Sequence, residues 1–218
     1  MRIGVLGTGM VGQTIGTKLV SVGQEVKMGS RVKGNDKAIA WVQSAGTGAG
    51  EGTFADAAQF ADEIVINATA GTASIDALSA AGSEHLAGKI LVDISNPLDF
   101  SAGFPPLLSV CNDDSMGEQI QNAFPDTRVV KSLNTMNAKI MVEPSLVPGS
   151  HNAFVAGNDA DAKRAVISLL ESFGWPPKDI IDLGDITASR GVEMFLPLWL
   201  RLYGSFDRGS FNIAVMRG

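Results

Sequence analysis

Cysteine and histidine are scarce in this chain of 218 residues, and basic residues form no cluster. The one cysteine, Cys111, has no partner within the chain, which excludes a disulfide scaffold and favours a reducing compartment. One cysteine and two separated histidines supply no metal-ligand set, so we expect no metal site. The 23 acidic and 17 basic residues give a net charge of −6 without a cationic face, so nucleic acid is not an expected partner.

Long apolar runs are also missing. The most apolar stretch, 194–203, is interrupted by Pro197 and Arg201, whereas a membrane-spanning helix needs about 18 apolar residues in a row. The apolar residues after Arg2 give way at once to glycines without a cleavage pattern, so we predict no signal peptide. These features predict a cytoplasmic protein that does not bind a membrane.

Apolar residues make up 45% of the chain, enough for one large core, and they gather in short runs that alternate with helical patterns. Each run is bounded by Gly, Asn, Asp or Pro, as is common for buried parallel strands. We expect strands at 3–6, 25–28, 63–68, 89–94, 128–133, 152–156 and 179–183. We expect helices near 10–22, 55–61, 72–81, 115–124, 160–173 and 188–204. This alternation predicts an α/β fold with a doubly wound, mostly parallel sheet.

Two connections depart from this regular pattern. The glycine- and alanine-rich stretch 45–52 predicts a flexible loop before a short third strand. The connection 99–114 is too long for a plain turn, which favours a lid or a cover.

The strongest motif, Gly7-Thr8-Gly9-Met10-Val11-Gly12, follows the first strand and opens the first helix. In this position the first glycine makes a tight turn, the second lets the backbone approach a pyrophosphate, and the third lets helix and strand pack closely. The complete strand–loop–helix–strand context favours this interpretation over a merely glycine-rich turn. We therefore predict a Rossmann-type domain that binds a dinucleotide through residues 7–12.

The end of the second strand indicates which dinucleotide is bound. An NAD site places Asp or Glu there, on the ribose 2′-hydroxyl. This chain instead has Ser30, Arg31 and Lys33, whose hydroxyl and cationic groups would hold a 2′-phosphate by charge-assisted hydrogen bonds. The sequence therefore favours NADP(H), with Lys37 as an alternative to Lys33. The competing interpretation is that Ser30 and Arg31 only begin a solvent-facing helix.

Two further loops are candidates, because ligands of such sheets bind beyond the carboxyl ends of the strands. Ala68, Thr69 and Ala70 follow one strand, and their small side chains would let the cofactor ribose lie against the backbone. Asn96 and Pro97 follow another strand, where Asn96 would offer its amide to the ligand. Both segments are also ordinary strand-end loops, and that alternative stays open.

With these motifs in place, the chain resembles the coenzyme F420-dependent NADP oxidoreductases over essentially its whole length. The resemblance is carried by the N-terminal glycines, Gly29-Ser30-Arg31, the segment 131–138 and the segment 189–193. It implies hydride exchange between NADPH and the 5-deazaflavin F420, in one α/β domain with a small C-terminal helical lobe.

The resemblance also implies roles for individual residues. Thr8 would join Ser30 and Arg31 at the 2′-phosphate. Asn137 and Ala138 would meet the nicotinamide, with the Ala138 backbone at its carboxamide. Some members have a histidine where this chain has Asn134.

A general acid is hard to find in the sequence. Reduction of a ketone or an imine commonly uses Tyr, His or Lys near the acceptor. Tyr203 falls on an apolar helix as a packed ring, His85 and His151 are expected at the surface, and Lys139 is expected to be solvated. We therefore assign no catalytic residue. An acceptor that spreads the electron pair over its own ring needs orientation more than a proton, and a flavin or deazaflavin meets that need.

The C-terminal part predicts an interface. The helix at 188–204 carries a buried stripe, and Met194, Leu198 and Leu200 extend its apolar surface beyond one core contact. A second subunit would cover the surplus, and 211–215 is expected to form a short terminal strand. We therefore predict a homodimer in which 1–184 is the NADP-binding domain and 185–218 contributes the acceptor pocket and the dimer contact.

Three functions remain open at this point. The first is an oxidoreductase that transfers a hydride between NADP(H) and F420 or a related flavin-like acceptor. The second is an NADPH-dependent reductase of a small carbonyl or imine, with water or Lys139 as the proton source. The third is a non-catalytic NADPH-binding redox sensor or electron-transfer module.

Overall fold

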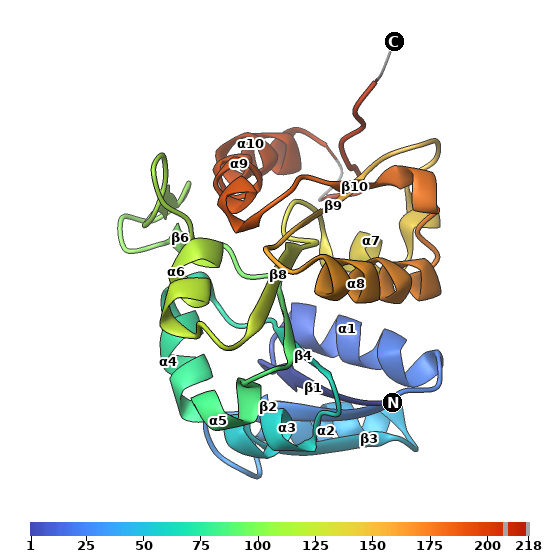
Figure 1. Ribbon diagram of the computed structural model, residues 1–218. Helices are drawn as coiled ribbons and strands as arrows, with labels where there is room; N and C mark the ends of the chain where they lie inside the picture. The colour runs from blue at the N-terminus through green and yellow to red at the C-terminus, as the bar shows by residue number, and fades with distance from the viewer. Residues whose placement is uncertain (207–208, 217–218) are drawn as a thin grey trace.

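Within the described residues, 1–206 and 209–216, the computed structural model has eight strands in one sheet (Figure 1). They are β1 (Arg2–Leu6), β2 (Glu25–Ser30), β3 (Ala49–Thr53), β4 (Ile64–Asn67), β5 (Ile90–Asp93), β8 (Arg128–Ser132), β9 (Ala153–Ala156) and β10 (Ile180–Asp182). Their order is β10-β9-β8-β5-β4-β1-β2-β3, and each neighbouring pair is parallel except β8 with β9. The predicted doubly wound, mostly parallel α/β sheet is confirmed.

Helices cover both faces of the sheet. They are α1 (Met10–Ser21), α2 (Asp36–Ala45), α3 (Phe54–Phe60), α4 (Gly71–Ala81), α5 (Ser83–Leu86), α6 (Met116–Ala123), α7 (Ala138–Val142), α8 (Ala160–Phe173), α9 (Ser189–Met194) and α10 (Leu196–Ser205), with single 3-10 turns η1 (Pro144–Leu146), η2 (Pro177–Asp179) and η3 (Ile186–Ala188). Strand side chains alternate between the two faces. Ile3 and Val5 of β1 therefore join the apolar cluster under α1, α2, α7 and α8, and Leu6 joins the cluster under α3 to α6.

The parallel arrangement brings several strand ends to one edge, where a ligand can bind. The carboxyl ends of β1, β2, β4 and β5 share this edge because these strands are parallel neighbours in the sheet. Helix α9 contacts α6, and α10 follows α9 at the opposite end of the molecule from β3 (Figure 1). Within the described part of the chain, no helix has both the length and the apolar character required to cross a membrane.

The two irregular connections contain strands. β3 begins inside the stretch 45–52, directly after Gly46 and Gly48, whose φ angles of +79° and +97° favour glycine. The connection 99–114 contains most of a small hairpin, in which β6 (Leu98–Asp99) pairs antiparallel with β7 (Leu107–Leu108).

Helix α2 is a correction to the sequence analysis, which expects no helix at 36–45. The Asn35 side chain caps this helix, because its oxygen accepts hydrogen bonds from the backbone N–H groups of Lys37 and Ala38, at 3.1 and 3.2 Å. Trp41 is buried beneath it, and its indole N–H donates to Thr17 Oγ1 at 3.0 Å. The helix therefore belongs to the core and is not a surface extension of β2.

The C-terminal elements differ from expectation in two ways. The helix predicted at 188–204 is two helices, α9 and α10, because Pro197 has no N–H to continue the hydrogen-bond ladder. The predicted strand at 211–215 is absent from the described residues. The segment is held instead by Asn152, whose N–H donates to Ile213 O at 2.9 Å and whose side-chain oxygen accepts from Val215 N–H at 2.7 Å. Residues 207–208 and 217–218 of the predicted region 185–218 lie outside the described residues.

Candidate functional site

The glycine motif forms a tight turn between β1 and α1. Gly7 has a φ of +116°, and a Cβ atom there would lie 2.6 Å from the carbonyl oxygen of Ala68. A Cβ on Gly12 would lie 2.1 Å from the carbonyl oxygen of Gly7. Gly9 differs, because a Cβ there would have no protein atom within 4 Å. Gly7 and Gly12 are therefore required by the protein's own packing, whereas Gly9 leaves open space at the start of α1.

This open space has the properties of an anion site. Gly9 caps α1 without any side-chain hydrogen bond, and no acidic residue lies in the first turn. The first N–H groups of the helix and the positive end of its dipole thus remain available to a negatively charged ligand. Met10, the next residue, is 67% exposed.

A cavity of about 720 Å³ extends from the glycine turn across the ends of β2 and β4. Its lining contains eight of the predicted site residues: Gly7, Thr8, Gly9, Ser30, Arg31, Ala68, Thr69 and Ala70. Arg31 is exposed and forms no hydrogen bond or ion pair with the described residues. The Ser30 hydroxyl donates to the carbonyl oxygen of Val32 at 2.5 Å and so fixes the turn that presents Arg31. Lys33 and Lys37 are exposed but do not line this cavity.

One face of α4 closes the cavity, and sequence reasoning missed it. Ala73, Asp76, Ala77 and Ala80 line it, at the spacing of neighbours on one side of a helix. The signal that could have revealed them is the run of small residues at this spacing. The three alanines leave room for a flat group. Asp76 adds a carboxylate to a cavity whose other charged lining residue is Arg31.

A second cavity, of about 390 Å³, continues the first. Ala68, Thr69 and Ala70 line both, so the two form one groove along the strand ends. The second cavity is also lined by the predicted residues Val11 and Asn96. Five residues after the end of β5 or in the hairpin line it as well and were not predicted: Ile94, Ser95, Leu98, Asp99 and Phe100. One half of the groove therefore contains the uncapped start of α1 and the Arg31 cation, and the other half is the second cavity.

The remaining predicted residues have supporting positions or lie elsewhere. Gly12 packs against the glycine turn, and Pro97 follows Asn96 without lining either cavity. Asn137 caps α7, where its side chain accepts from Lys139 N–H at 3.1 Å, and Ala138 is buried. Neither residue lines the groove, although α7 packs against α1.

A buried polar network lies behind the groove. Thr69 Oγ1 donates to Asn67 Oδ1 at 2.6 Å, and Asn67 Nδ2 donates to Asp93 Oδ1 at 2.8 Å. Lys131 donates to Asp93 Oδ2 at 2.7 Å and to Ser95 O at 2.6 Å, and it pairs with Glu193 Oε1 at 2.7 Å. Burial opposes the Lys131 charge, but the adjoining Asp93 and Glu193 carboxylates raise the pKa of its amine. Lys131 is therefore a buried cation, and its three hydrogens face three acceptors.

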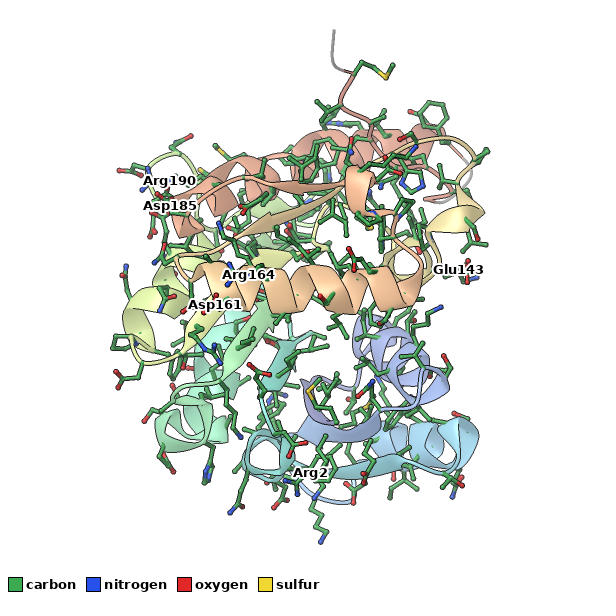
Figure 2. All side chains as sticks on the ribbon, turned by 45° about the vertical axis from the view of Figure 1, so that its right-hand side comes forward. Arg2, Glu143, Asp161, Arg164, Asp185 and Arg190 are labelled. Atoms are coloured by element: carbon green, nitrogen blue, oxygen red, sulfur yellow. The ribbon has the colours of Figure 1, made fainter. Side chains whose placement is uncertain are left out.

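Glu193 connects this network to α6. Its carboxylate also accepts from the backbone N–H groups of Met116 and Gly117, at 2.8 and 3.1 Å. One turn along, Arg190 Nε donates to Glu118 Oε2 at 2.8 Å. This guanidinium lowers the pKa of Glu118, against the effect of burial and with the help of a hydrogen bond from Ser115. Figure 2 shows Arg190 close to Asp185, at the opposite end of the molecule from Arg2. Helix α9 is thus fixed to α6 by charged groups.

Asn134, the position where some family members have histidine, forms a reciprocal amide pair with Asn96. Asn134 Nδ2 donates to Asn96 Oδ1 at 2.9 Å, and Asn96 Nδ2 donates to Asn134 O at 2.9 Å. Asn134 Nδ2 also donates to Val192 O at 3.1 Å. Its amide group therefore faces protein atoms on both sides and holds the loop after β5 in place.

The candidate acids are engaged or distant. His151, expected at the surface, is instead buried, with ring nitrogens 3.0 Å from Pro144 O and 2.9 Å from Asn212 Nδ2, because it anchors the C-terminal segment. Tyr203 stacks on Trp199 with ring centroids 5.1 Å apart. Lys139 is exposed and lines a separate depression between α1 and α7. Asp99 lines the second cavity, but hydrogen bonds with Ser101 lower its pKa. It is a poor proton donor near neutral pH.

Comparisons with known proteins place the chain among NADP oxidoreductases. Residues 2–97 match the family described as NADP oxidoreductase coenzyme F420-dependent. A crystal structure from Arthrobacter sp. FB24, provisionally described as an F420-dependent NADP-reductase, is 51% identical, with a TM-score of 0.94 and 100% of each chain covered. The rat metalloreductase STEAP3 is 28% identical over 91% of this chain and 38% of its own length, so the chain spans well under half of that relative.

More distant structures share the fold alone. One is the pyrroline carboxylate reductase of Plasmodium falciparum, a structure with NADP bound. It is 15% identical, with a TM-score of 0.57, and the match covers 93% of this chain and 66% of the other.

Proposed function

Because the chain belongs to the family of coenzyme F420-dependent NADP oxidoreductases, we propose that it transfers a hydride between NADP(H) and coenzyme F420 or a related flavin-like acceptor. The observation that carries this proposal is the continuous groove, in which Ala68 to Ala70 line both a phosphate-compatible cavity and a second compartment. A dinucleotide and an acceptor that must meet face to face need such an arrangement.

The residues present fit NADP(H). The open space at Gly9 and the uncapped start of α1 suit a pyrophosphate. Thr8, Ser30 and the free Arg31 suit the 2′-phosphate, with Lys33 or Lys37 as a second cation. Thr69 and Asn96 would orient the nicotinamide half, and Asn137 and Ala138 would support it from α7. When bound, NADPH supplies the hydride, and water supplies the further proton that a two-electron reduction of the acceptor takes up.

The second compartment fits an acceptor that the protein orients but does not protonate. Phe100 lies at its rim with 58% of its surface exposed, so its ring face is available to a flat ligand. Asp99, the one titratable group among the described residues that line this cavity, has a lowered pKa. A deazaflavin or flavin, which delocalises the incoming electron pair over its own ring, suits this lining better than a carbonyl or an imine.

The substitution Arg31→Ala tests the cofactor assignment. We expect NADPH binding to weaken by about 1.5–3 kcal/mol more than NADH binding, because a charge-assisted hydrogen bond to the 2′-phosphate is lost. Calorimetric titration measures both affinities. Arg164→Ala is the control, since Arg164 lies on α8 beside Asp161 (Figure 2) and lines neither cavity of the groove. Equal losses for NADPH and NADH would refute the assignment.

Stopped-flow mixing with NADPH and F420 tests the acceptor assignment. We expect the deazaflavin absorbance to bleach in a single turnover. Turnover of a small imine or carbonyl that collapses in Lys139→Ala, without bleaching of F420, would favour the carbonyl or imine reductase instead. Tight NADPH binding with no hydride transfer to any acceptor would favour the non-catalytic redox module.

We further propose that residues 1–184 form the NADP-binding domain and that 185–218 contributes to the acceptor pocket and a homodimer contact. Leu198 of α10 is 56% exposed and Met194 of α9 is 39% exposed, so both offer apolar surface. Sedimentation at micromolar concentration checks the dimer, and a monomeric profile would refute it.

A further inference from the structure

Two buried hydrogen-bond relays connect the groove to helix α9. The first runs from Thr69 through Asn67, Asp93 and Lys131 to Glu193. The second runs from Asn96 through Asn134 to the carbonyl oxygen of Val192. Thr69 and Asn96 line the second cavity, whereas Val192 and Glu193 are adjacent residues of α9 that line neither cavity. Two separate loops of the groove are thus held by the same turn of one helix.

In the second relay, the side-chain amide of Asn134 has no spare hydrogen-bond donor. Asn134 is only 3% exposed, and both hydrogens of its side-chain amide are directed to acceptors, one on Asn96 and one on Val192. If α9 moved, one of these hydrogen bonds would break and leave a buried polar group without a partner. Asn134 holds the Asn96 side chain through both its own side chain and its backbone carbonyl, so a shift of Asn134 that follows α9 would reorient Asn96.

The first relay resists movement for a different reason. The Lys131, Asp93 and Glu193 side chains are almost completely inaccessible, and the Glu193 carboxylate is held by two N–H groups at the start of α6. Separating Glu193 from Lys131 would leave the buried Glu193 carboxylate without its cationic partner. Helix α9 therefore has one preferred position, here called its seat, and the positions of the two groove loops that contain Thr69 and Asn96 depend on it.

We propose that Asn134 is a positioning residue that couples the seat of α9 to the binding of the nicotinamide half of NADPH. This inference rests on the proposed function, because it assumes that NADPH occupies the groove. In the proposed function the adenosine half would lie near Ser30 and Arg31, which line the first cavity and form no part of this relay.

The test compares two ligands on the full chain. NADPH contains the nicotinamide half, and 2′,5′-ADP contains only the adenosine half with its 2′-phosphate. We expect Asn134→Leu to weaken NADPH about 10-fold, as lost buried hydrogen bonds do, and to change 2′,5′-ADP affinity less than about twofold. Asn134→Ser keeps one donor and should weaken NADPH to an intermediate extent. Asn122→Ala is the control, because Asn122 is an exposed asparagine on α6.

Several outcomes decide the matter. Unchanged NADPH affinity in both Asn134 variants overturns the coupling. An equal loss for NADPH and 2′,5′-ADP also overturns it, because that pattern indicates general destabilisation. If Asn134→Leu does not fold, the Asn134→Ser variant gives the same comparison. Failure of the unaltered protein to bind either ligand would refute the proposed function itself, which is a different result from selective loss in the variants.

Discussion

The buried lysine of the network gives the sharpest stability prediction. Lys131→Met would leave the Asp93 and Glu193 carboxylates buried without their shared cation. Breaking a buried pair by removing one partner costs about 3–5 kcal/mol, a large share of the 5–15 kcal/mol typical of whole domains. Methionine has nearly the volume of the lysine stem, so the loss measures charge and not packing. We therefore expect a free energy of unfolding lower by about 3–5 kcal/mol.

Urea unfolding followed by tryptophan fluorescence measures this change. Arg2→Met is the control, because Arg2 pairs with Asp62 at the surface, where the two side chains are 51% and 41% exposed, and exposed pairs contribute about 0–1 kcal/mol. Adding Glu193→Gln to the Lys131→Met protein should recover part of the loss, since one uncompensated carboxylate is then removed. A loss no larger than that of the control would show that the buried triad does not stabilise the fold.

The sign of the pH dependence follows from the direction of the pKa shift. The pKa of Lys131 is raised above its ordinary value of 10.5. Its contribution is therefore fully present below that value and is lost only as pH rises through the folded-state pKa. The difference between the unaltered protein and Lys131→Met, as far as the lysine determines it, should be constant across neutral pH.

Three further predictions address the groove and α9. Gly12→Ala should lower the melting temperature and abolish NADPH binding in calorimetry, because its Cβ would lie 2.1 Å from Gly7 O. Gly9→Ala should impair NADPH binding but leave the melting temperature unchanged, because a Cβ there meets no protein atom within 4 Å. Identical behaviour of the two variants would contradict this reasoning. Phe100→Ala should raise the KM for F420 several-fold without changing NADPH affinity, and Phe104→Ala, on the same hairpin but outside the cavity lining, should change neither. The pKa of Glu118 is lowered by Arg190, so its stabilisation is present above the unfolded value and lost as pH falls through the folded value. Glu118→Gln should flatten the acid limb of a stability–pH curve below about pH 4.5, and an unchanged limb would refute that role.

Local signals in the sequence predicted much of the groove, because a turn motif and its chemistry are adjacent in the chain. Gly7 and Gly9 are identified by spacing, and Ser30 and Arg31 by their place after a strand. The sequence also contains a weak signal for α2. Ala38, Trp41, Val42 and Ala45 repeat at helical spacing after the capping Asn35, but alanines are weak apolar markers and the glycines that follow suggest a loop.

The network behind the groove could not be predicted in the same way. Lys131, Asp93 and Glu193 come from β8, β5 and α9, and a lysine or glutamate considered alone indicates exposure. His151 was misplaced for a related reason, since a histidine next to a turn becomes buried only when a distant segment covers it, here through Asn212. Long-range polar pairing depends on the assembled sheet, and periodicity along the chain does not report it.

The same pairing bears on which acceptor the site can serve. Lys131 contacts the lining of the second cavity through the carbonyl oxygen of Ser95, yet its hydrogens are committed to Asp93, Ser95 and Glu193. Releasing a proton from it would leave two carboxylates in the interior without a counterion, which its raised pKa opposes. The network therefore serves to hold loops and helix in register, and it keeps the lysine from acting as an acid. A site organised in this way orients two rings and leaves the proton to water, and a deazaflavin or flavin is the class of acceptor for which that is sufficient.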